Sequence, residues 1–303
     1  MTFSADIVFE GIDATPEQSE WFASFLNTND FSANTRKART NDVRKFARWF
    51  TEANGESFSV SRVTQRDVVD FKQHSRRTDN QSVSTVNRAL VSLRKYFGWL
   101  VEAGHLQLNP VVGVKELRKQ QTAPKGLTQP QVRKLLREIE IRQDVRANAV
   151  FHLMLYTGCR VSDIANLGLS DVVIQPRSGS VTFRLGKGGK ERTVPLPLPA
   201  RKAIQAYLDV RPVDESELVF HGKRGPLTDR GFRALCDKYG ELLGFKLHPH
   251  LLRHTMAHKF LDDTGNDLVS LAQLLGHQNI NTTAIYTKRT QDQLAAAVDN
   301  LTY

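Results

Sequence analysis

The second half of the chain holds five short segments whose residue types can break and rejoin a phosphodiester bond without a metal ion. That reaction needs a nucleophile in line with the bond, cations on the non-bridging oxygens and an acid for the leaving 5′ oxygen. Arginine suits the oxygens because its planar guanidinium binds two of them and keeps its charge. The segments are Thr157–Asp163 (TGCRVSD), Gly186–Arg192 (GKGGKER), His250–Thr255 (HLLRHT), Leu275–His277 (LGH) and Thr282–Tyr286 (TTAIY).

Two arginines and a histidine in these segments have the chemistry and the spacing of a phosphate site. Arg160 follows the residues TGC, where the chain is expected to turn into a helix; an ordinary surface arginine is the alternative. His250 lies three residues before Arg253, and on a helix this spacing places both side chains on one face. A neutral imidazole, with an ordinary pKa of about 6.5, is suited to proton transfer at physiological pH.

Three further positions in these segments carry polar side chains: Lys187, Asp163 and His277. Lys187 lies in the turn GKGGK between two expected strands, where an ammonium can donate a proton to the leaving oxygen; Lys190 is the alternative acid, and a plain charged turn remains possible. Asp163 follows Arg160 by three residues and can orient that arginine or a catalytic histidine, or form a surface salt bridge. His277 lies where a helix is expected to end, and from its position alone it can cap that helix or pack there.

Tyr286 is the candidate nucleophile. Aromatic residues at helical spacing usually belong to a core. Here the residues NTT at 281–283 are expected to cap a short helix with Tyr286 about one turn in. The remaining tyrosines lie outside any such segment: Tyr96, Tyr156, Tyr207, Tyr239 and the last residue, Tyr303.

A zinc site is the competing interpretation of the histidines. His250, His254 and His258 recur every four residues, so they can share a helix face. The segment lacks the glutamate of an HExxH motif, and Asp262 is the remaining candidate for a fourth ligand. We therefore expect no metal, with His254 packing beside the site and His258 in a structural role.

Together, in this order and with Tyr286 nine residues after His277, the segments resemble the tyrosine recombinase family, also called phage-type integrases. The resemblance runs from about residue 14 to the C-terminus and is clearest over 127–288. It implies a catalytic set of six residues: Arg160, Lys187, His250, Arg253, His277 and Tyr286. The arginines would clamp the phosphate, the first lysine of GKGGK would be the acid and the tyrosine the nucleophile. The histidine of HLLRHT would bind phosphate or accept the tyrosine proton, and that of LGH would hold the phosphate.

The same resemblance implies a reaction and an assembly. A site-specific recombinase of this kind cleaves and rejoins DNA through a 3′-phosphotyrosine intermediate and a Holliday junction, with no metal or other cofactor. Its partners would be double-stranded DNA and identical chains, four on two DNA sites, or a second recombinase. Two alternatives stay open, a type IB topoisomerase that relaxes DNA and a non-catalytic DNA-binding protein.

These residues must be positioned by two domains of different classes. We expect a mostly α N-terminal domain, a helical bundle over 14–108, with helices over Ser32–Gly55, Thr64–His74 and Ser82–Glu102. A polar, basic and exposed linker is expected over 109–126. An α+β catalytic domain should cover 127–303, with a small antiparallel sheet between Val172 and Leu196 and helices again from Ala200 to the end.

Charge and composition favour a DNA partner inside a cell. The net charge is +10 and the pI about 9.7, as expected for a chain that binds a polyanion. Two cysteines without a CxxC pair, and no long apolar run, favour a cytoplasmic protein without a membrane segment. The expected DNA contacts of the N-terminal domain are Arg36, Arg39, Arg44, Lys45, Arg88 and Arg94.

The end of the chain carries one more pattern. Leu294, Ala297, Val298 and Leu301 form an apolar stripe at helical spacing. This stripe either packs on its own domain or, as the resemblance implies, belongs to a C-terminal exchange helix that docks into a neighbouring protomer.

Overall fold

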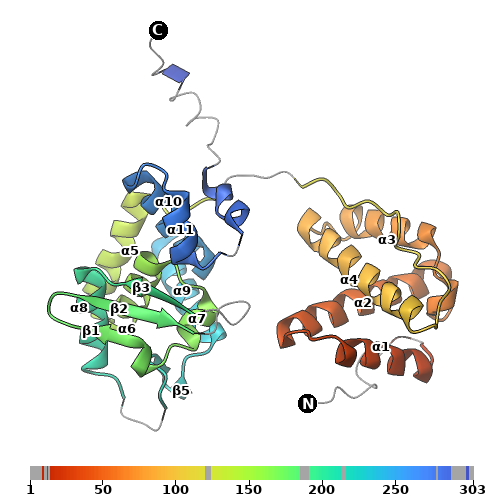
Figure 1. Ribbon diagram of the computed structural model, residues 1–303, viewed down its shortest axis with the longest axis horizontal. Coiled ribbons are helices and arrows are strands. Elements are labelled where there is room, and N and C mark those ends of the chain that lie inside the picture. The colour runs from red at the N-terminus through yellow and green to blue at the C-terminus, as the bar shows by residue number, and fades with distance from the viewer. Residues whose placement is uncertain are drawn as a thin grey trace. The chain divides into compact units, whose positions relative to one another are not determined.

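The computed structural model describes residues 9, 12, 14–119, 124–184, 191–212, 216–277, 279–287 and 298–299. The chain divides into two compact units, Met1–Gln120 and Gln121–Tyr303. The predicted classes are confirmed, because the first unit is helical and the second combines helices with a small antiparallel sheet (Figure 1). Within the described ranges, no helix has both the length and the apolar character that crossing a bilayer requires.

The described part of the N-terminal unit contains four α-helices: α1 (Pro16–Thr28), α2 (Ala33–Asn54), α3 (Gln65–Arg77) and α4 (Val83–Glu102), with a 3-10 turn η2 (Val60–Arg62) before α3. The three predicted helices correspond to α2, α3 and α4. Each begins where Ser32, Thr64 or Ser82 accepts a hydrogen bond from a backbone N–H three residues later. Helix α1 was not predicted.

The segment that follows α4 is not exposed over its whole length. Val111 and Val114 are buried in the N-terminal core. Asn87 of α4 pairs with the backbone of Leu117, donating to its carbonyl and accepting from its N–H at 2.8 Å each. The first residues of the expected exposed linker are therefore packed on the N-terminal unit. The sequence did not indicate this packing, because two apolar residues three positions apart are too few to mark a core segment.

The second unit opens with three helices, α5 (Gln129–Ile141), α6 (Val145–Thr157) and α7 (Val161–Ala165). A 3-10 turn η3 (Leu169–Asp171) leads into the antiparallel sheet of β1 (Val172–Ile174), β2 (Gly179–Phe183) and β3 (Arg192–Pro195), in that order. The predicted sheet between Val172 and Leu196 is confirmed.

The remaining elements are mostly helical. They are α8 (Leu198–Leu208), the short strands β4 (His221–Gly222) and β5 (Gly225–Pro226), α9 (Asp229–Leu243), α10 (Pro249–Asp263), α11 (Leu268–Leu275) and the 3-10 turns η4 (Ile280–Thr282) and η5 (Ala284–Thr287). The expectation of helices alone after Ala200 was wrong at the β4–β5 hairpin. Its strands have two residues each, too short for an alternating pattern.

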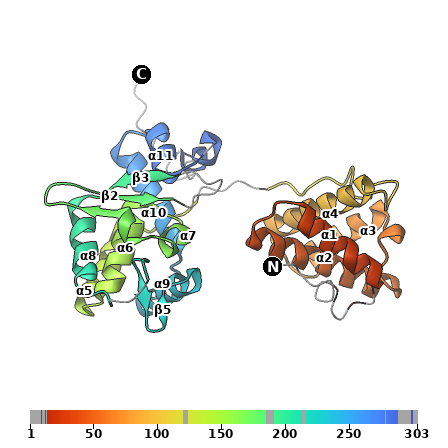
Figure 2. The ribbon, with the colours of Figure 1, turned by 60° about the horizontal axis from the view of Figure 1, so that its bottom comes forward.

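Close packing brings the site segments together. Helix α10 packs against α6 and α11, and α11 lies beside β3 (Figure 2). Gly158 ends α6 with φ 59°, and a Cβ atom there would lie 2.8 Å from Cδ2 of Leu275. Gly158 thus packs directly on the side chain of Leu275 at the end of α11, and this close approach places Arg160 near His277.

Candidate active site

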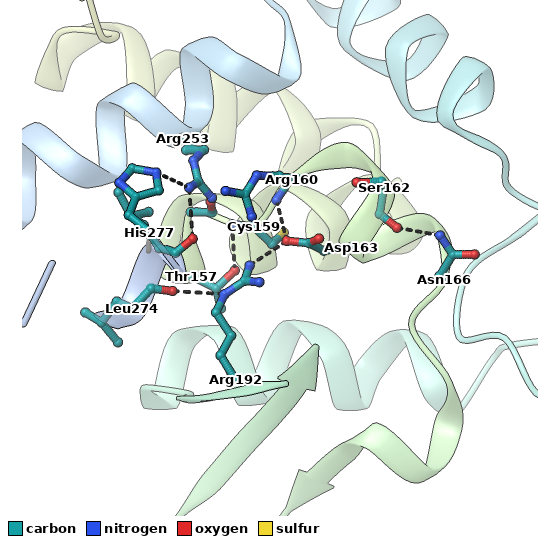
Figure 3. Close-up of polar contacts among 12 residues, drawn as sticks. Thr157, Cys159, Arg160, Ser162, Asp163, Asn166, Arg192, Arg253, Leu274 and His277 are labelled. Carbon is teal, nitrogen blue, oxygen red and sulfur yellow. Dashed lines mark hydrogen bonds and ion pairs between the residues drawn. The ribbon is translucent and has the colours of Figure 1, made fainter. Parts of the chain in front are cut away.

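Arg253 is a buried cation in the middle of α10. Its side chain reaches two other segments, where Nη1 donates to the Gly158 carbonyl and Nη2 donates to the Leu275 carbonyl at 2.9 Å (Figure 3). Burial, and then the charge of Arg160, lower its pKa to about 10. Among the residues that the structure describes, no carboxylate forms an ion pair with Arg253. The guanidinium is therefore fixed in place without a neutralising anion.

His277 links this arginine to the segment that carries Tyr286. Its Nε2 lies 2.8 Å from Nη2 of Arg253, and Nδ1 lies 2.8 Å from Oγ1 of the buried Thr283. Because a guanidinium only donates, Nε2 is the acceptor, and Nδ1–H donates to Thr283. Burial, and then the charge of Arg253, lower the pKa of His277 to about 4, so the ring is neutral at physiological pH.

Arg160 lies at the start of α7, beside Arg253 and His277. Its backbone N–H donates to Oδ2 of Asp163 at 3.0 Å, which fixes the turn. Its guanidinium, in a half-buried position, is close enough to lower the pKa of both Arg253 and His277. Figure 3 shows these side chains around the turn after α6. Two arginine charges thus face one small region.

Asp163 is a buried carboxylate that connects the Arg160 turn to Arg192. It is 5% exposed and accepts a hydrogen bond from Nη2 of Arg192 as well as from the Arg160 backbone. Within the described residues it bonds neither the Arg160 guanidinium nor a histidine, and its contact with Arg160 is to the backbone; an orienting role for it stays a prediction. Its salt bridge with Arg192 is also buried, not on the surface.

Arg192 is a site residue that sequence reasoning missed. It extends from β3, where Nε donates to the Leu274 carbonyl at 3.1 Å and the guanidinium carbon lies 4.6 Å from the centre of the Phe183 ring. Its position at the end of GKGGKER was the available signal, but no local pattern indicated its partners. One side chain therefore connects β3, α7 and α11.

Tyr286 lies on η5 and is 6% exposed. Its hydroxyl is 3.0 Å from Nδ1 of His254, and its ring packs against the rings of His254 and His258, with centroids 5.5 Å away in each case. Burial raises the pKa of Tyr286, and the charge of Arg253 opposes that effect. The short helix expected around this residue is instead a pair of 3-10 turns, η4 and η5.

The three histidines of α10 have separate surroundings. His250 is exposed, with its ring stacked 6.3 Å from that of His254. His258 Nε2 lies 2.7 Å from the Pro124 carbonyl, a structural role as expected. His254 was expected only to pack beside the site, yet its ring nitrogen contacts the Tyr286 hydroxyl. Its position four residues after His250, on the same helix face, was the signal for this.

The two candidate acids, Lys187 and Lys190, lie outside the described residues. The structure describes the strands before and after them, with β2 ending at Phe183 and β3 beginning at Arg192. The assignment of an acid therefore stays a prediction.

Comparisons with known proteins identify the family of the chain and support its fold. Residues 125–293 match the model of the phage integrase family, and residues 19–104 match the phage integrase N-terminal SAM-like domain. The tyrosine recombinase XerA of Pyrococcus furiosus is 33% identical over 289 residues, 93% of each chain. XerC of Actinobacillus pleuropneumoniae is 37% identical over 218 residues, 69% of each chain.

The chain belongs to the phage integrase family, the tyrosine recombinases.

Solved structures support the fold of this recombinase. The XerH recombinase bound to its difH substrate, a pre-cleavage complex, aligns with a TM-score of 0.71 at 20% identity, covering 99% of this chain and 85% of that one. A lambda integrase dimer bound to a COC′ core site aligns with a TM-score of 0.71 at 15% identity, covering 94% and 84%. The predicted family and enzyme class, a DNA strand-exchanging recombinase of the Xer type, are confirmed.

The cations predicted to contact DNA in the N-terminal unit of the recombinase are partly engaged within that unit. Three form ion pairs: Lys45 with Asp79 at 2.8 Å, Arg88 with the buried Asp42 at 2.9 Å, and Arg94 with Glu116 at 3.2 Å. Of the rest, all on α2, Arg36 donates to the Phe31 carbonyl, Arg39 lies over the Phe31 ring and Arg44 is half-buried. Their contacts with DNA stay predictions.

Proposed function

We propose that this recombinase exchanges strands between two specific DNA sites, through a covalent bond to Tyr286 and a Holliday junction. The tyrosine oxygen attacks the phosphorus, the bond from phosphorus to the 5′ oxygen breaks, and the DNA remains attached through its 3′ phosphate. A 5′-hydroxyl from the partner strand then attacks and releases the tyrosine. Because one phosphodiester is exchanged for another, the reaction needs no high-energy cofactor, and we propose that it needs no metal.

The buried guanidinium of Arg253, without a carboxylate partner among the described residues, carries this proposal. Arg253 and Arg160 together would hold the non-bridging oxygens of the phosphate that Tyr286 attacks, with His277 beside them. Donors fixed before the substrate binds stabilise developing charge without reorganising during the reaction. This arrangement fits a phosphate better than a structural salt bridge.

The proposal also includes an acid for the leaving oxygen and a further residue that binds the phosphate. Lys187 would protonate the leaving 5′ oxygen, with Lys190 as the alternative acid in the same turn. His250 would bind the phosphate, a role that suits its exposed position at the start of α10. Partial desolvation, and then the charge of Arg253, lower the pKa of His250, which favours its neutral imidazole.

The proposed DNA complex uses both units. The helical unit over 14–108 would clamp one face of the duplex with its cations, and the unit over 127–303 would supply the chemistry. The XerH and lambda integrase structures contain DNA, and the net charge of +10 supports the same partner here. A ring of four protomers on two sites would complete the assembly.

The direct test is Tyr286→Phe on a nicked duplex that traps the covalent intermediate, in buffer with a chelator. The variant lacks only the attacking oxygen, so it should bind DNA normally and form no covalent adduct on a denaturing gel. Tyr156→Phe, which changes an exposed tyrosine of the same unit, is the matched control and should form adduct normally. An adduct of normal yield with Tyr286→Phe, or loss of adduct on chelation in the unmodified protein, would refute the proposal.

A further inference from the structure

We propose that His254 is the catalytic residue that accepts the proton of the Tyr286 hydroxyl as the tyrosine attacks the phosphate. This inference rests on the proposed role of Tyr286 as nucleophile. It adds a second catalytic histidine on α10, distinct from the phosphate-binding role of His250.

The geometry places one basic atom at the hydroxyl. Nδ1 of His254 lies 3.0 Å from the Tyr286 oxygen, a normal hydrogen-bond length. The two rings are in contact, with centroids 5.5 Å apart, so the imidazole holds the phenol from α10 while η5 supplies the backbone. With its proton on Nε2, the His254 ring presents a free lone pair at Nδ1 to the tyrosine O–H.

The other side chains around the Tyr286 hydroxyl are not placed to accept its proton. Nε2 of His258 is held by the Pro124 carbonyl, so that nitrogen is a donor, and the ring of His258 meets the tyrosine ring edge to face. Arg253 only donates. The ring of His250 is stacked behind that of His254, and within the described residues it makes no contact with Tyr286.

The protonation states are consistent with this transfer. Burial raises the pKa of Tyr286, so the phenol still carries its proton at physiological pH. Burial, then the neighbouring His250 and His258, then Arg253, lower the pKa of His254 to about 4, so its ring starts neutral. A phosphate held at Arg253 adds negative charge nearby, which favours the imidazolium once the proton has moved.

The proton balance is complete in both directions. During cleavage the O–H bond of Tyr286 breaks, its oxygen bonds to phosphorus, and the proton moves to Nδ1 of His254. The leaving 5′ oxygen receives a different proton, from the acid of the GKGGK turn. During rejoining the 5′-hydroxyl returns its proton to that acid, which lost one during cleavage, and attacks phosphorus; the bond from phosphorus to the tyrosine oxygen breaks, and His254 returns its proton to that oxygen.

The proposal can be tested by replacing Tyr286 with a tyrosine analogue that loses its proton without the help of a base. Difluorotyrosine, whose phenol ionises near neutral pH, can be introduced at position 286 by amber suppression. With ordinary tyrosine, His254→Ala should slow single-turnover cleavage by about 10²- to 10⁴-fold, the usual effect of removing a general base. With difluorotyrosine, the same variant should recover to within a few-fold of the unmodified protein. Arg253→Ala should stay slow with either tyrosine.

His254→Asn separates proton transfer from positioning. The asparagine oxygen can accept a hydrogen bond near the position of Nδ1, but it does not take up the proton. We expect this variant to be slow with ordinary tyrosine and restored by difluorotyrosine. Full activity of His254→Asn with ordinary tyrosine, a faster rate in His254→Ala, or rescue of His250→Ala instead of His254→Ala would overturn the proposal. Adducts that persist in Tyr286→Phe would instead reject the nucleophile itself.

Discussion

Arg253 has neighbours that hold it but do not neutralise it. One of its nitrogens is shared between the Leu275 carbonyl and the neutral ring of His277. A phosphate oxygen is a stronger acceptor than either, because the resulting hydrogen bond joins two charges. The cost of burying an unpaired guanidinium in the free protein is therefore recovered when DNA binds. At the residue scale, the site is organised before its substrate arrives.

This preorganisation predicts different effects on cleavage and on binding. Arg253→Ala and Arg160→Ala should each slow single-turnover cleavage by about a hundredfold or more, because each removes a fixed donor to the transition state. DNA affinity, measured by gel shift, should fall far less, since many other phosphate contacts remain. Arg253→Lys should stay slow because it keeps the charge without the planar fork.

The control is Arg177→Ala, which changes an exposed arginine of the same unit. It should leave cleavage unchanged, and thermal melting should confirm that every variant folds. Equal losses of cleavage and affinity in the Arg253 and Arg160 variants would make these residues ordinary DNA contacts.

Site residues could be proposed from the sequence where they lie within a short motif. Arg160, Arg253, His277 and Tyr286 were proposed from local segments, and the structure places them together. The hydrogen bond of His254 to Tyr286 was not predicted, because it joins residues 32 apart in the chain. Only the packing of η5 on α10 brings them together.

At the scale of elements, Arg192 connects the sheet to both sides of the site. It reaches Asp163 at α7 and the Leu274 carbonyl at the end of α11. Room for its side chain comes from Gly276, where an added Cβ would lie 2.9 Å from Cδ of Arg192. Strand β3, the Arg160 turn and the His277 turn are thereby fixed to one another.

Gly276→Ala tests this connection. The new methyl group should displace Arg192 and slow cleavage by about tenfold to a hundredfold, the scale of a small misplacement of catalytic groups. Gly265→Ala is the matched control: Gly265 has φ 64°, almost the 65° of Gly276, but nothing within 4 Å of an added Cβ. Both variants carry the backbone strain, and only one displaces Arg192. Equal cleavage rates in single-turnover assays would show that the connection has no role in catalysis.

Elements were predicted where cap residues and long apolar patterns agreed, as for α2, α3 and α4. Helix α1 was missed although Phe22, Phe25 and Leu26 are buried at helical spacing. Its N-cap Thr15 makes no capping hydrogen bond to a backbone N–H, and its Oγ1 accepts from the Gln18 side chain instead. The turns around Tyr286 were expected to be a regular helix. A segment of four or five residues cannot distinguish an α-turn from a 3-10 turn, and packing on α10 decides between them.

At the scale of the whole molecule, the segment between the units is attached at both ends. Residues near 117 are hydrogen-bonded to α4, and Leu127 donates to Thr255 of α10 at 2.8 Å. Pro124 is held by His258, whose ring also packs on Tyr286. The entry of the chain into the second unit therefore lies close to the proposed nucleophile.

Assembly on two DNA sites gives a prediction at this scale. Most of the apolar stripe of Leu294, Ala297, Val298 and Leu301 lies outside the described residues. If this helix docks into a neighbouring protomer, head-to-tail contacts close a ring of four. Deleting residues 290–303 should then leave single-site binding nearly normal and abolish the two-site complex in sedimentation velocity.

Full-length Tyr286→Phe is the control for that experiment, because it keeps the helix and lacks only the chemistry. It should assemble normally on two-site DNA. A four-protomer complex that persists after the deletion would exclude exchange of the C-terminal helix, and a truncated protein that no longer folds would show that the helix packs on its own unit.

The central feature of the proposed reaction is the bond between Tyr286 and the 3′ phosphate of DNA. Trapped adduct, digested with trypsin and nuclease and analysed by mass spectrometry, identifies the modified residue. We predict that the peptide Phe260–Lys288 carries a nucleotide joined through its 3′ phosphate to Tyr286. A nucleotide on another residue, or one joined through its 5′ phosphate, would contradict the account.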